Sequence, residues 1–253
     1  MNLKTETKTA LIDLELISYS HAAKAESTGT GLQSLVEMVE FTIQSVVSAC
    51  RAQKHYLVVS GRDNFRKVLY PDYKAGRREK PALYVPLMDK LEESNASRWC
   101  KHDQLEADDL LGIMLTNGRV KNPILCSIDK DLLGVPGWHY NWNKDDWPRG
   151  VTQAEADFHW LVQLLMGDST DNIEGMKGIG IAKAQKLASA YCEKTRTPLA
   201  PIPAAEKIYK AEGFTLDAYK KCLMLISIWR SPMPAELLEN ELILEVSKTI
   251  PSL

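Results

Sequence analysis

Three short apolar runs limit the folds that this chain can adopt. They are TALIDL (Thr9 to Leu14), YLVVS (Tyr56 to Ser60) and PILCSI (Pro123 to Ile128). Such runs are typical of strands buried on both faces of a parallel sheet, and helical segments such as residues 32–52 separate them. We therefore predict an α/β fold, a mostly parallel sheet flanked by helices. Ligands of such sheets bind beyond the carboxyl ends of the strands, where Asp13 and Asp129 lie.

The composition indicates a soluble globular protein. With 253 residues, 45% of them apolar, the chain can bury a full core in one large domain or in a core with a smaller appended part. The five cysteines form no CxxC pair and no metal-binding spacing with histidine, which favours a reducing compartment. The N-terminus has no hydrophobic signal core, and no apolar run reaches the roughly 20 residues of a membrane span. We expect a cytoplasmic monomer with no membrane partner.

Seven acidic residues fall in three tight clusters. They are Glu106, Asp108 and Asp109, then Asp129 and Asp131, then Asp168 and Asp171. Each cluster alone has an ordinary explanation, as first-turn acids that complement a helix dipole or as capping residues of a turn. All three explanations would have to hold at once in this chain. Carboxylates that gather in a fold repel one another and lose hydration, and a cation such as Mg²⁺ relieves both effects. The pattern therefore favours a magnesium site.

A glycine-rich run follows the last acidic cluster directly. It reads GMKGIGIAKAQKL, from Gly175 to Leu187. Gly178 and Gly180 allow a tight turn with close backbone approach, and the residues after them continue as a helix. We interpret the run as a helix–hairpin–helix that binds the DNA backbone without reading bases; the alternative is an ordinary connection between helices. Binding of this kind should be independent of sequence and sensitive to salt.

Basic residues are concentrated rather than abundant. The formal net charge is −2, but residues 66–80, RKVLYPDYKAGRREK, are dense in lysine and arginine, and more basic residues follow the glycine run. A solvated loop would show the same density. Clustered acids in a metal site would offset a basic binding face, so the net charge does not argue against a nucleic-acid partner.

Five motifs in this order resemble the 5′ nuclease family, which comprises bacteriophage 5′→3′ exonucleases, the 5′-nuclease domains of bacterial DNA polymerase I and flap endonucleases. They are LIDLELIS, NFRKVLYPDYKAGR, EADD, SIDKDL and GDSTDNIEGMKGIGIAKAQKL, and they span roughly residues 9 to 190. The last motif is the most specific. Without a polymerase extension, the chain resembles the stand-alone phage members, which would place it in a host cytoplasm.

The resemblance implies a PIN-like sheet and a set of site residues. Around the first metal it implies Asp13, Glu106, Asp108 and Asp109, and around the second Asp129, Asp131, Asp168 and Asp171. It implies contacts of Arg66 and Lys74 with the scissile phosphate, and stacking of Tyr73 on a base. It also implies substrate contacts of Arg77, Lys177 and Lys183. Gly178 and Gly180 would form the hairpin that holds K⁺.

The same resemblance implies a division of the chain. Residues 1–165 would form the nuclease core, with a helical arch at about residues 72–95 through which the 5′ end of a flap passes. Residues 166–253 would form a helical DNA-binding part with the helix–hairpin–helix.

One departure from the family concerns the first metal. Members commonly have an aspartate directly after the second strand, but this chain reads VVSGRDNFR there. Either the loop is shortened and Asp63 serves as a ligand, or Ser60 and Gly61 occupy the position and fewer carboxylates hold the metal.

We predict a 5′→3′ exonuclease and structure-specific flap endonuclease that acts on DNA with 5′ flaps, nicks or free 5′ ends. Two Mg²⁺ ions about 3.5–4 Å apart, for which Mn²⁺ can substitute, would activate a water and stabilise the leaving oxygen. The five histidines form no triad and no HExxH motif, and none is needed as a base. Two alternatives stay open: a PIN-like ribonuclease, and a duplex DNA-binding module without catalysis.

Overall fold

A computed structural model describes residues 6–250, and a six-stranded sheet forms its centre. The strand order is β3-β2-β1-β4-β5-β6, with every neighbouring pair parallel except β5 and β6. The strands are β1 (Thr9–Asp13), β2 (Lys54–Val59), β3 (Trp99–Lys101), β4 (Pro123–Cys126), β5 (Gly137–Tyr140) and β6 (Arg149–Val151). The mostly parallel sheet is confirmed. The first and third apolar runs contain the inner strands β1 and β4, and the second covers most of β2.

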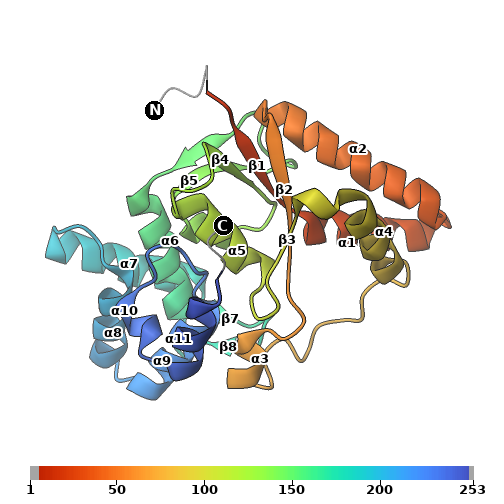
Figure 1. The fold of residues 1–253 in the computed structure, drawn as a ribbon. Coiled ribbons are helices and arrows are strands. Elements are labelled where there is room, and N and C mark those ends of the chain that lie inside the picture. Colours follow the sequence, from red (N-terminus) through yellow and green to blue (C-terminus); the bar gives the residue numbers. More distant parts are fainter. Residues whose placement is uncertain (1–5, 251–253) are drawn as a thin grey trace.

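Helices cover both faces of the sheet, as Figure 1 shows. One face packs against α1 (Leu14–Thr28), α2 (Leu32–Cys50) and α4 (Tyr84–Asn95), and the other against α5 (Ala107–Thr116) and α6 (Gln153–Met166). Alternate residues of β1 point to the two faces. Ala10 and Ile12 pack on the side of α1, α2 and α4, and Leu11 packs on the side of α5 and α6. Burial on both faces explains why the strands read as continuous apolar runs.

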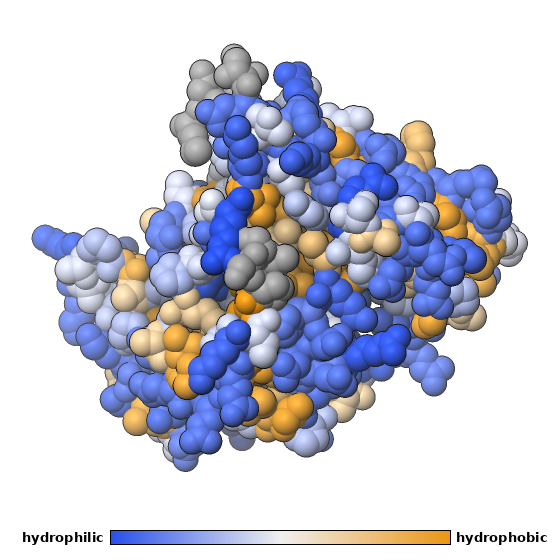
Figure 2. Space-filling model, in the orientation of Figure 1, coloured by the Kyte–Doolittle hydropathy of each residue, from blue (hydrophilic) through white to orange (hydrophobic). Residues whose placement is uncertain are grey.

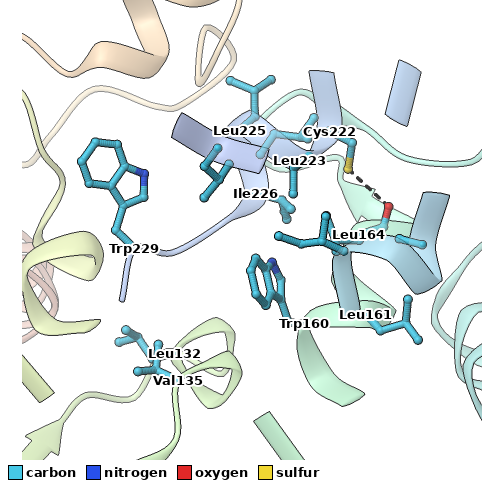
Figure 3. Packing of buried hydrophobic residues seen from close by; sticks show 14 of the residues in the cluster. Leu132, Val135, Trp160, Leu161, Leu164, Cys222, Leu223, Leu225, Ile226 and Trp229 are labelled. Carbon is cyan, nitrogen blue, oxygen red and sulfur yellow. Dashed lines mark hydrogen bonds between the residues drawn. The ribbon is translucent and has the colours of Figure 1, made fainter. Parts of the chain in front are cut away.

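The C-terminal part is helical and extends the core on the α5 and α6 side. A short hairpin follows α6, and helices complete the chain: β7 (Gly167–Asp168), β8 (Ile173–Glu174), α7 (Ile181–Thr195), α8 (Pro201–Ala211), α9 (Leu216–Ile226), α10 (Ala235–Leu238) and α11 (Glu241–Lys248). Figure 3 shows Leu161 and Leu164 of α6 near Cys222 of α9, whose thiol donates to the Leu164 carbonyl over 3.4 Å. This helical part therefore shares one hydrophobic core with the sheet.

The segment expected to be a helical arch differs from the prediction. After α3 (Phe65–Leu69), residues 71–76 form turns and residues 77–81 have no regular structure. The only helix in the range is α4, whose Tyr84, Leu87 and Leu91 are buried against α1 and α2. Their spacing of three and four residues makes one face of α4 apolar. This face therefore packs in the core and is not exposed to solvent. Residues 70–83 connect α3 to α4 (Figure 1).

The face in Figure 2 is mainly hydrophilic, with apolar side chains in small patches. Among residues 6–250, no helix is both long enough and apolar enough to cross a membrane.

Candidate metal and phosphate site

The first element of the site is Asp13, the last residue of β1. Its side chain caps α1, accepting the Leu16 amide at 3.4 Å, and its other oxygen accepts the Ser127 hydroxyl at 2.8 Å. Ser127 follows β4, the neighbouring strand, so two strand ends meet here. Burial, together with the charges of Glu15 and Asp129, raises the pKa of Asp13 to about 7, although the Ser127 hydrogen bond lowers it.

The first turn of α5 adds Asp108. Glu106 is the N-cap of this helix, and the turn is closed by a capping box between Glu106 and Asp109. No hydrogen bond from the described residues reaches the Asp108 carboxylate. Burial raises its pKa well above the usual range, and the charges of Asp13, Asp129 and Glu106 act in the same direction. Asp108 therefore lies among other acids, and the charge of Lys74 only partly offsets their effect on its pKa.

The loop after β4 and the β7 end supply three more carboxylates. Asp129 accepts the backbone amide of Asp131 at 2.8 Å, and its own amide donates to Ser127 over 3.0 Å. Asp168, in β7, accepts the Thr170 amide at 2.8 Å. Burial raises the pKa of Asp131 to about 6, and the charges of Asp129 and Asp168 contribute. The second acidic group is thus assembled from segments about forty residues apart in sequence.

Lys74 joins the two remaining acids. Its ammonium forms an ion pair with Glu106, and it lies 3.6 Å from an oxygen of Asp171. The backbone at Lys74 is left-handed (φ +59°), and its amide donates to the Asp171 carbonyl over 3.0 Å. Arg77 holds the same Asp171 carboxylate at 2.6 Å. Burial would raise the pKa of Glu106, but the Lys74 and Arg66 charges hold it below its usual range.

Apart from Asp13, these groups line a pocket of about 250 Å³ at the carboxyl edge of the sheet. Its polar lining comprises Arg66, Tyr73, Lys74, Arg77, Glu106, Asp108, Asp129, Lys130, Asp131, Gln163, Asp168, Thr170 and Asp171. Within residues 6–250, Asp13, Asp108, Asp129, Asp131 and Asp168 form no ion pair.

Divalent cations fit this set of residues. The unpaired acids raise one another's pKa, which is the condition a bound cation relieves. In the described part of the chain, no three acidic, histidine or cysteine side chains already stand at the spacing of a complete metal site. Mg²⁺ keeps several of its waters and can be held partly through them, so such spacing suits it.

Asp109 and Arg66 are paired with each other, unlike the open set of acids. Arg66 donates to both oxygens of Asp109, at 2.6 and 2.8 Å, and its other N–H groups reach the carbonyls of Leu225 and Ser227, each at 2.8 Å. Asp109 also accepts the Trp229 amide at 3.1 Å. Both side chains are buried. The pair ties α3 and α5 to the C-terminal part. Both oxygens of Asp109 are engaged, while Arg66 is buried but still contributes to the pocket lining.

Tyr73 and Asp63 also differ from their predicted roles. The Tyr73 ring is 4% exposed and its hydroxyl donates to Glu106 over 2.8 Å, so it cannot stack on a base in this structure. Burial raises its pKa, which keeps the hydroxyl protonated as a donor. Asp63 is exposed and lies outside the pocket lining. Ser60 and Gly61 therefore occupy the position after β2, as in the second of the two alternatives.

Three residues of the site have no counterpart among the predictions. Ser127 orients Asp13, Gln163 of α6 lines the pocket beside Asp131, and Glu15 lies near Asp13. The sequence holds a signal for two of them: Ser127 stands two residues before Asp129, and Glu15 two residues after Asp13. Such spacing can bring side chains to one strand end. Gln163 lies within an apolar helix, and nothing in its local pattern sets it apart.

The glycine run forms an open backbone turn before α7. Residues 176–178 turn, Gly178 has φ +78°, and Gly180 is the N-cap of α7. A Cβ at Gly178 or Gly180 would meet no atom within 4 Å, so this backbone faces solvent. Lys177 and Lys183 are exposed on either side, and the Lys183 ammonium donates to the Gly178 carbonyl over 3.3 Å. The turn combines free backbone groups with two cations, which suits a phosphate.

The fold with its acidic strand ends places the chain in a known structural class. It resembles the bacteriophage T5 flap endonuclease crystallised with DNA and metal ions, with TM-score 0.64 and 15% identity, over 95% of this chain and 97% of that one. It also resembles the catalytic core of Rad2 in complex with DNA, with TM-score 0.55 and 12% identity, over 90% and 80% of the two chains. At these identities the likeness concerns the fold.

Sequence similarity defines the family. The chain belongs to the family described as 5′-3′ exonuclease, N-terminal resolvase-like domain, whose model matches residues 8–146. It is 29% identical over 140 residues to an exonuclease of Escherichia phage T7, covering 53% of this chain and 47% of that protein. It is 31% identical over 164 residues to an exodeoxyribonuclease of Enterobacteria phage T3, covering 62% and 52%. The chain thus matches about half the length of these relatives.

Proposed function

We propose that this protein is a divalent-metal-dependent 5′→3′ exonuclease and structure-specific 5′-flap endonuclease of DNA, acting as a monomer. The observation that carries the proposal is the pocket that brings the unpaired carboxylates of Asp108, Asp129, Asp131 and Asp168 together with Lys74. Fold and family membership are in agreement with it. A protein that only binds duplex DNA gains nothing from burying mutually repelling acids, because their desolvation costs folding free energy.

The acids divide into two groups by position. Asp13 and Asp108 would hold one Mg²⁺ ion, and Asp129, Asp131 and Asp168 the other, with Mn²⁺ as a substitute. When bound, the ions supply activation of the attacking water and charge stabilisation at the leaving oxygen. Ser127 fixes the Asp13 carboxylate by a 2.8 Å hydrogen bond, and Asp129 fixes the turn that carries Asp131. Glu106 and Asp171 act by holding Lys74.

Lys74 provides the cation for the scissile phosphate. Its ammonium is only partly exposed, so its interaction with a phosphoryl oxygen is weakly screened. A preorganised cation at this place stabilises the charge that develops in the transition state. Arg77, whose side chain is half exposed beside Asp171, would bind a neighbouring phosphate. The irregular residues 74–83 then form the passage for a 5′ end.

The hairpin supplies affinity rather than chemistry. Backbone groups at Gly178 and Gly180, with K⁺ on the hairpin carbonyls, and the side chains of Lys177 and Lys183 would bind phosphates of the duplex. None of these groups reads a base, so binding should be independent of sequence and fall as salt rises. K⁺ would replace the Lys183 ammonium at the Gly178 carbonyl.

One set of cleavage assays tests the proposal. Labelled 5′-flap, nicked-duplex and single-stranded DNA are incubated with Mg²⁺, with EDTA, and with Mg²⁺ and the Lys74→Met variant. We expect Mg²⁺-dependent cleavage of the flap and a loss of at least about a hundredfold in the variant, with flap affinity in Ca²⁺ nearly unchanged. Lys67→Met removes an exposed lysine of the same basic segment and is the matched control.

Two results would overturn the proposal. Binding without cleavage under every metal condition would leave the duplex-binding module. Faster cleavage of a matched RNA flap than of the DNA flap would leave the PIN-like ribonuclease.

A further inference from the structure

The carboxyl edge of the sheet lacks an acid at one of its inner strands. β1 ends in Asp13, and the loop after β4 carries Asp129, but β2 is followed by Ser60 and Gly61. Gly61 cannot be replaced by an acid, because a Cβ there would lie 2.0 Å from the Asp103 carbonyl oxygen and 2.2 Å from that of His102. The Gly61 amide also donates to the Leu105 carbonyl over 2.8 Å. The loop before α5, which includes His102 and Asp103, thus packs directly against the Gly61 backbone.

A carboxylate from α1 reaches this place instead. Glu15 lies two residues after Asp13, and its Oε2 accepts the Ser60 hydroxyl at 2.5 Å. The same Ser60 oxygen accepts the amide of Ala107, the first residue of α5, at 3.0 Å. Two hydrogen bonds therefore connect the Glu15 carboxylate to the helical turn that carries Asp108. The Tyr84 hydroxyl, 3.4 Å from Oε1, holds the other oxygen.

This arrangement places a third negative charge beside Asp13 and Asp108. Ser60 binds Glu15, which lies two residues after Asp13, and it also accepts the amide of Ala107, the residue before Asp108, so Glu15 lies at the strand end that carries both acids. Glu15 is partly exposed and forms no ion pair among the described residues. Glu15 complements the dipole of α1 from its first turn, and its hydrogen bond with Ser60 also directs its carboxylate toward the end of β2.

We propose that Glu15, held by Ser60, is a further carboxylate of the first metal site and supplies the charge that the end of β2 lacks. The inference rests on the proposed function, because it assumes that Asp13 and Asp108 hold a divalent ion. Glu15 would bind the ion directly or through one of its waters, and Ser60 is a positioning residue that acts through Glu15.

The test is a Mn²⁺ titration of the full chain without DNA, followed by electron paramagnetic resonance of the free ion. Glu15→Gln removes the charge but keeps an oxygen that can accept from Ser60 and Tyr84, so the fold should survive. We expect wild type to bind two ions and Glu15→Gln to bind one of them at least about tenfold more weakly. Glu37→Gln, on the exposed face of α2, makes the same change in charge away from the site and should bind as wild type does.

A rescue variant separates a metal role from a structural one. In Glu15→Gln with Ser60→Asp, the carboxylate returns on the β2 side and can still accept the Ala107 amide, so the lost affinity should return at least in part. A thermal melt gives an independent readout. Without metal, Glu15→Gln should melt no lower than wild type, because a repelling charge is removed, whereas Ca²⁺ should raise its melting temperature less.

The outcomes distinguish this inference from the function on which it rests. Asp131→Asn serves as the reference for the second ion. If it weakens Mn²⁺ binding while Glu15→Gln binds like wild type, Glu15 is a structural acid and the inference fails alone. A lower metal-free melting temperature with unchanged Mn²⁺ binding would likewise assign Glu15 a structural role. If wild type binds no Mn²⁺, the inference and the proposed function fail together.

Discussion

Two neighbouring carboxylates on the first turn of α5 have opposite surroundings. Asp109 is fully buried and receives two hydrogen bonds from the Arg66 guanidinium and one from the Trp229 amide. Asp108, one residue earlier, faces Asp13 and Asp129 and has no cation of its own. A buried charge that is paired and hydrogen-bonded holds elements together, whereas one left among like charges costs folding free energy. The comparison separates the architecture of the pocket from its chemistry.

The largest effect should come from removing unpaired acids of the pocket, and it should appear in the rate of cleavage. Asp129→Ala with Asp131→Ala removes two anions from the second group, so we expect Mg²⁺-dependent flap cleavage to fall by about three orders of magnitude or more. Flap affinity in Ca²⁺ should change little, because the hairpin and the basic segment supply most backbone contacts. Cleavage rates and a binding titration check both parts. Near-normal cleavage by the double variant would make these acids an ordinary turn.

Changes to the buried Arg66–Asp109 pair should lower the stability of the protein. Arg66→Met leaves Asp109 buried without its partner, and we expect the free energy of unfolding to fall by about 3–5 kcal/mol. Replacing both residues, with Arg66→Met and Asp109→Leu, should recover much of the loss, because no unpaired charge remains. Urea denaturation of the two variants measures the difference. An Arg66→Met variant as stable as wild type would show that the pair holds nothing together.

The unpaired acids should also make the metal-free protein sensitive to pH. The pKa values of Asp13, about 7, and Asp131, about 6, lie above those of unfolded aspartates, so the folded state binds more protons between about pH 4 and 7. In EDTA, the contribution of these two groups to stability should therefore be largest at and below about pH 4 and should fall by a few kcal/mol between about pH 4 and pH 8. Ca²⁺ should flatten the profile. Identical thermal-melt profiles with and without Ca²⁺ would argue against a cation at these acids.

The smallest effect concerns the hairpin. Gly178→Ala places a side chain at φ +78° in open space, so we expect a loss of only about 1 kcal/mol in stability and a clear loss of duplex affinity. Gly180→Ala, at an ordinary φ of −88°, should leave stability nearly unchanged and still weaken binding. Fluorescence anisotropy with a long duplex, read beside thermal melts, makes the comparison. Wild-type affinity in both variants would remove the hairpin from the DNA interface.

Much of the fold was accessible from the sequence because its signals are local. The strands β1, β2 and β4 are continuous apolar runs, and the acids at their ends fall at one edge once the strands are parallel. The turn at Gly178 likewise follows from the residues that form it. Local patterns of this kind do not depend on which distant segment packs nearby.

The features that the sequence did not reveal are contacts between residues that lie far apart along the chain. Arg66 bonds to carbonyls 159 and 161 residues further along the chain, and its basic segment gives no sign of this. Tyr73 looks like an exposed aromatic among basic residues until Glu106 accepts its hydroxyl. The packing of α4 was hidden for a different reason. The apolar spacing of Tyr84, Leu87 and Leu91 is visible in the sequence, but the helices α1 and α2 on which these residues pack lie far away along the chain.

The contrast between the two sides of α5 can be measured directly by anomalous diffraction from crystals soaked in Mn²⁺. We expect anomalous density among Asp13, Asp108, Asp129, Asp131 and Asp168, with the Arg66–Asp109 pair intact and no density beside it. A map without Mn²⁺ in this pocket, or with Mn²⁺ bound to Asp109 and Arg66 displaced, would contradict the division between paired and unpaired acids.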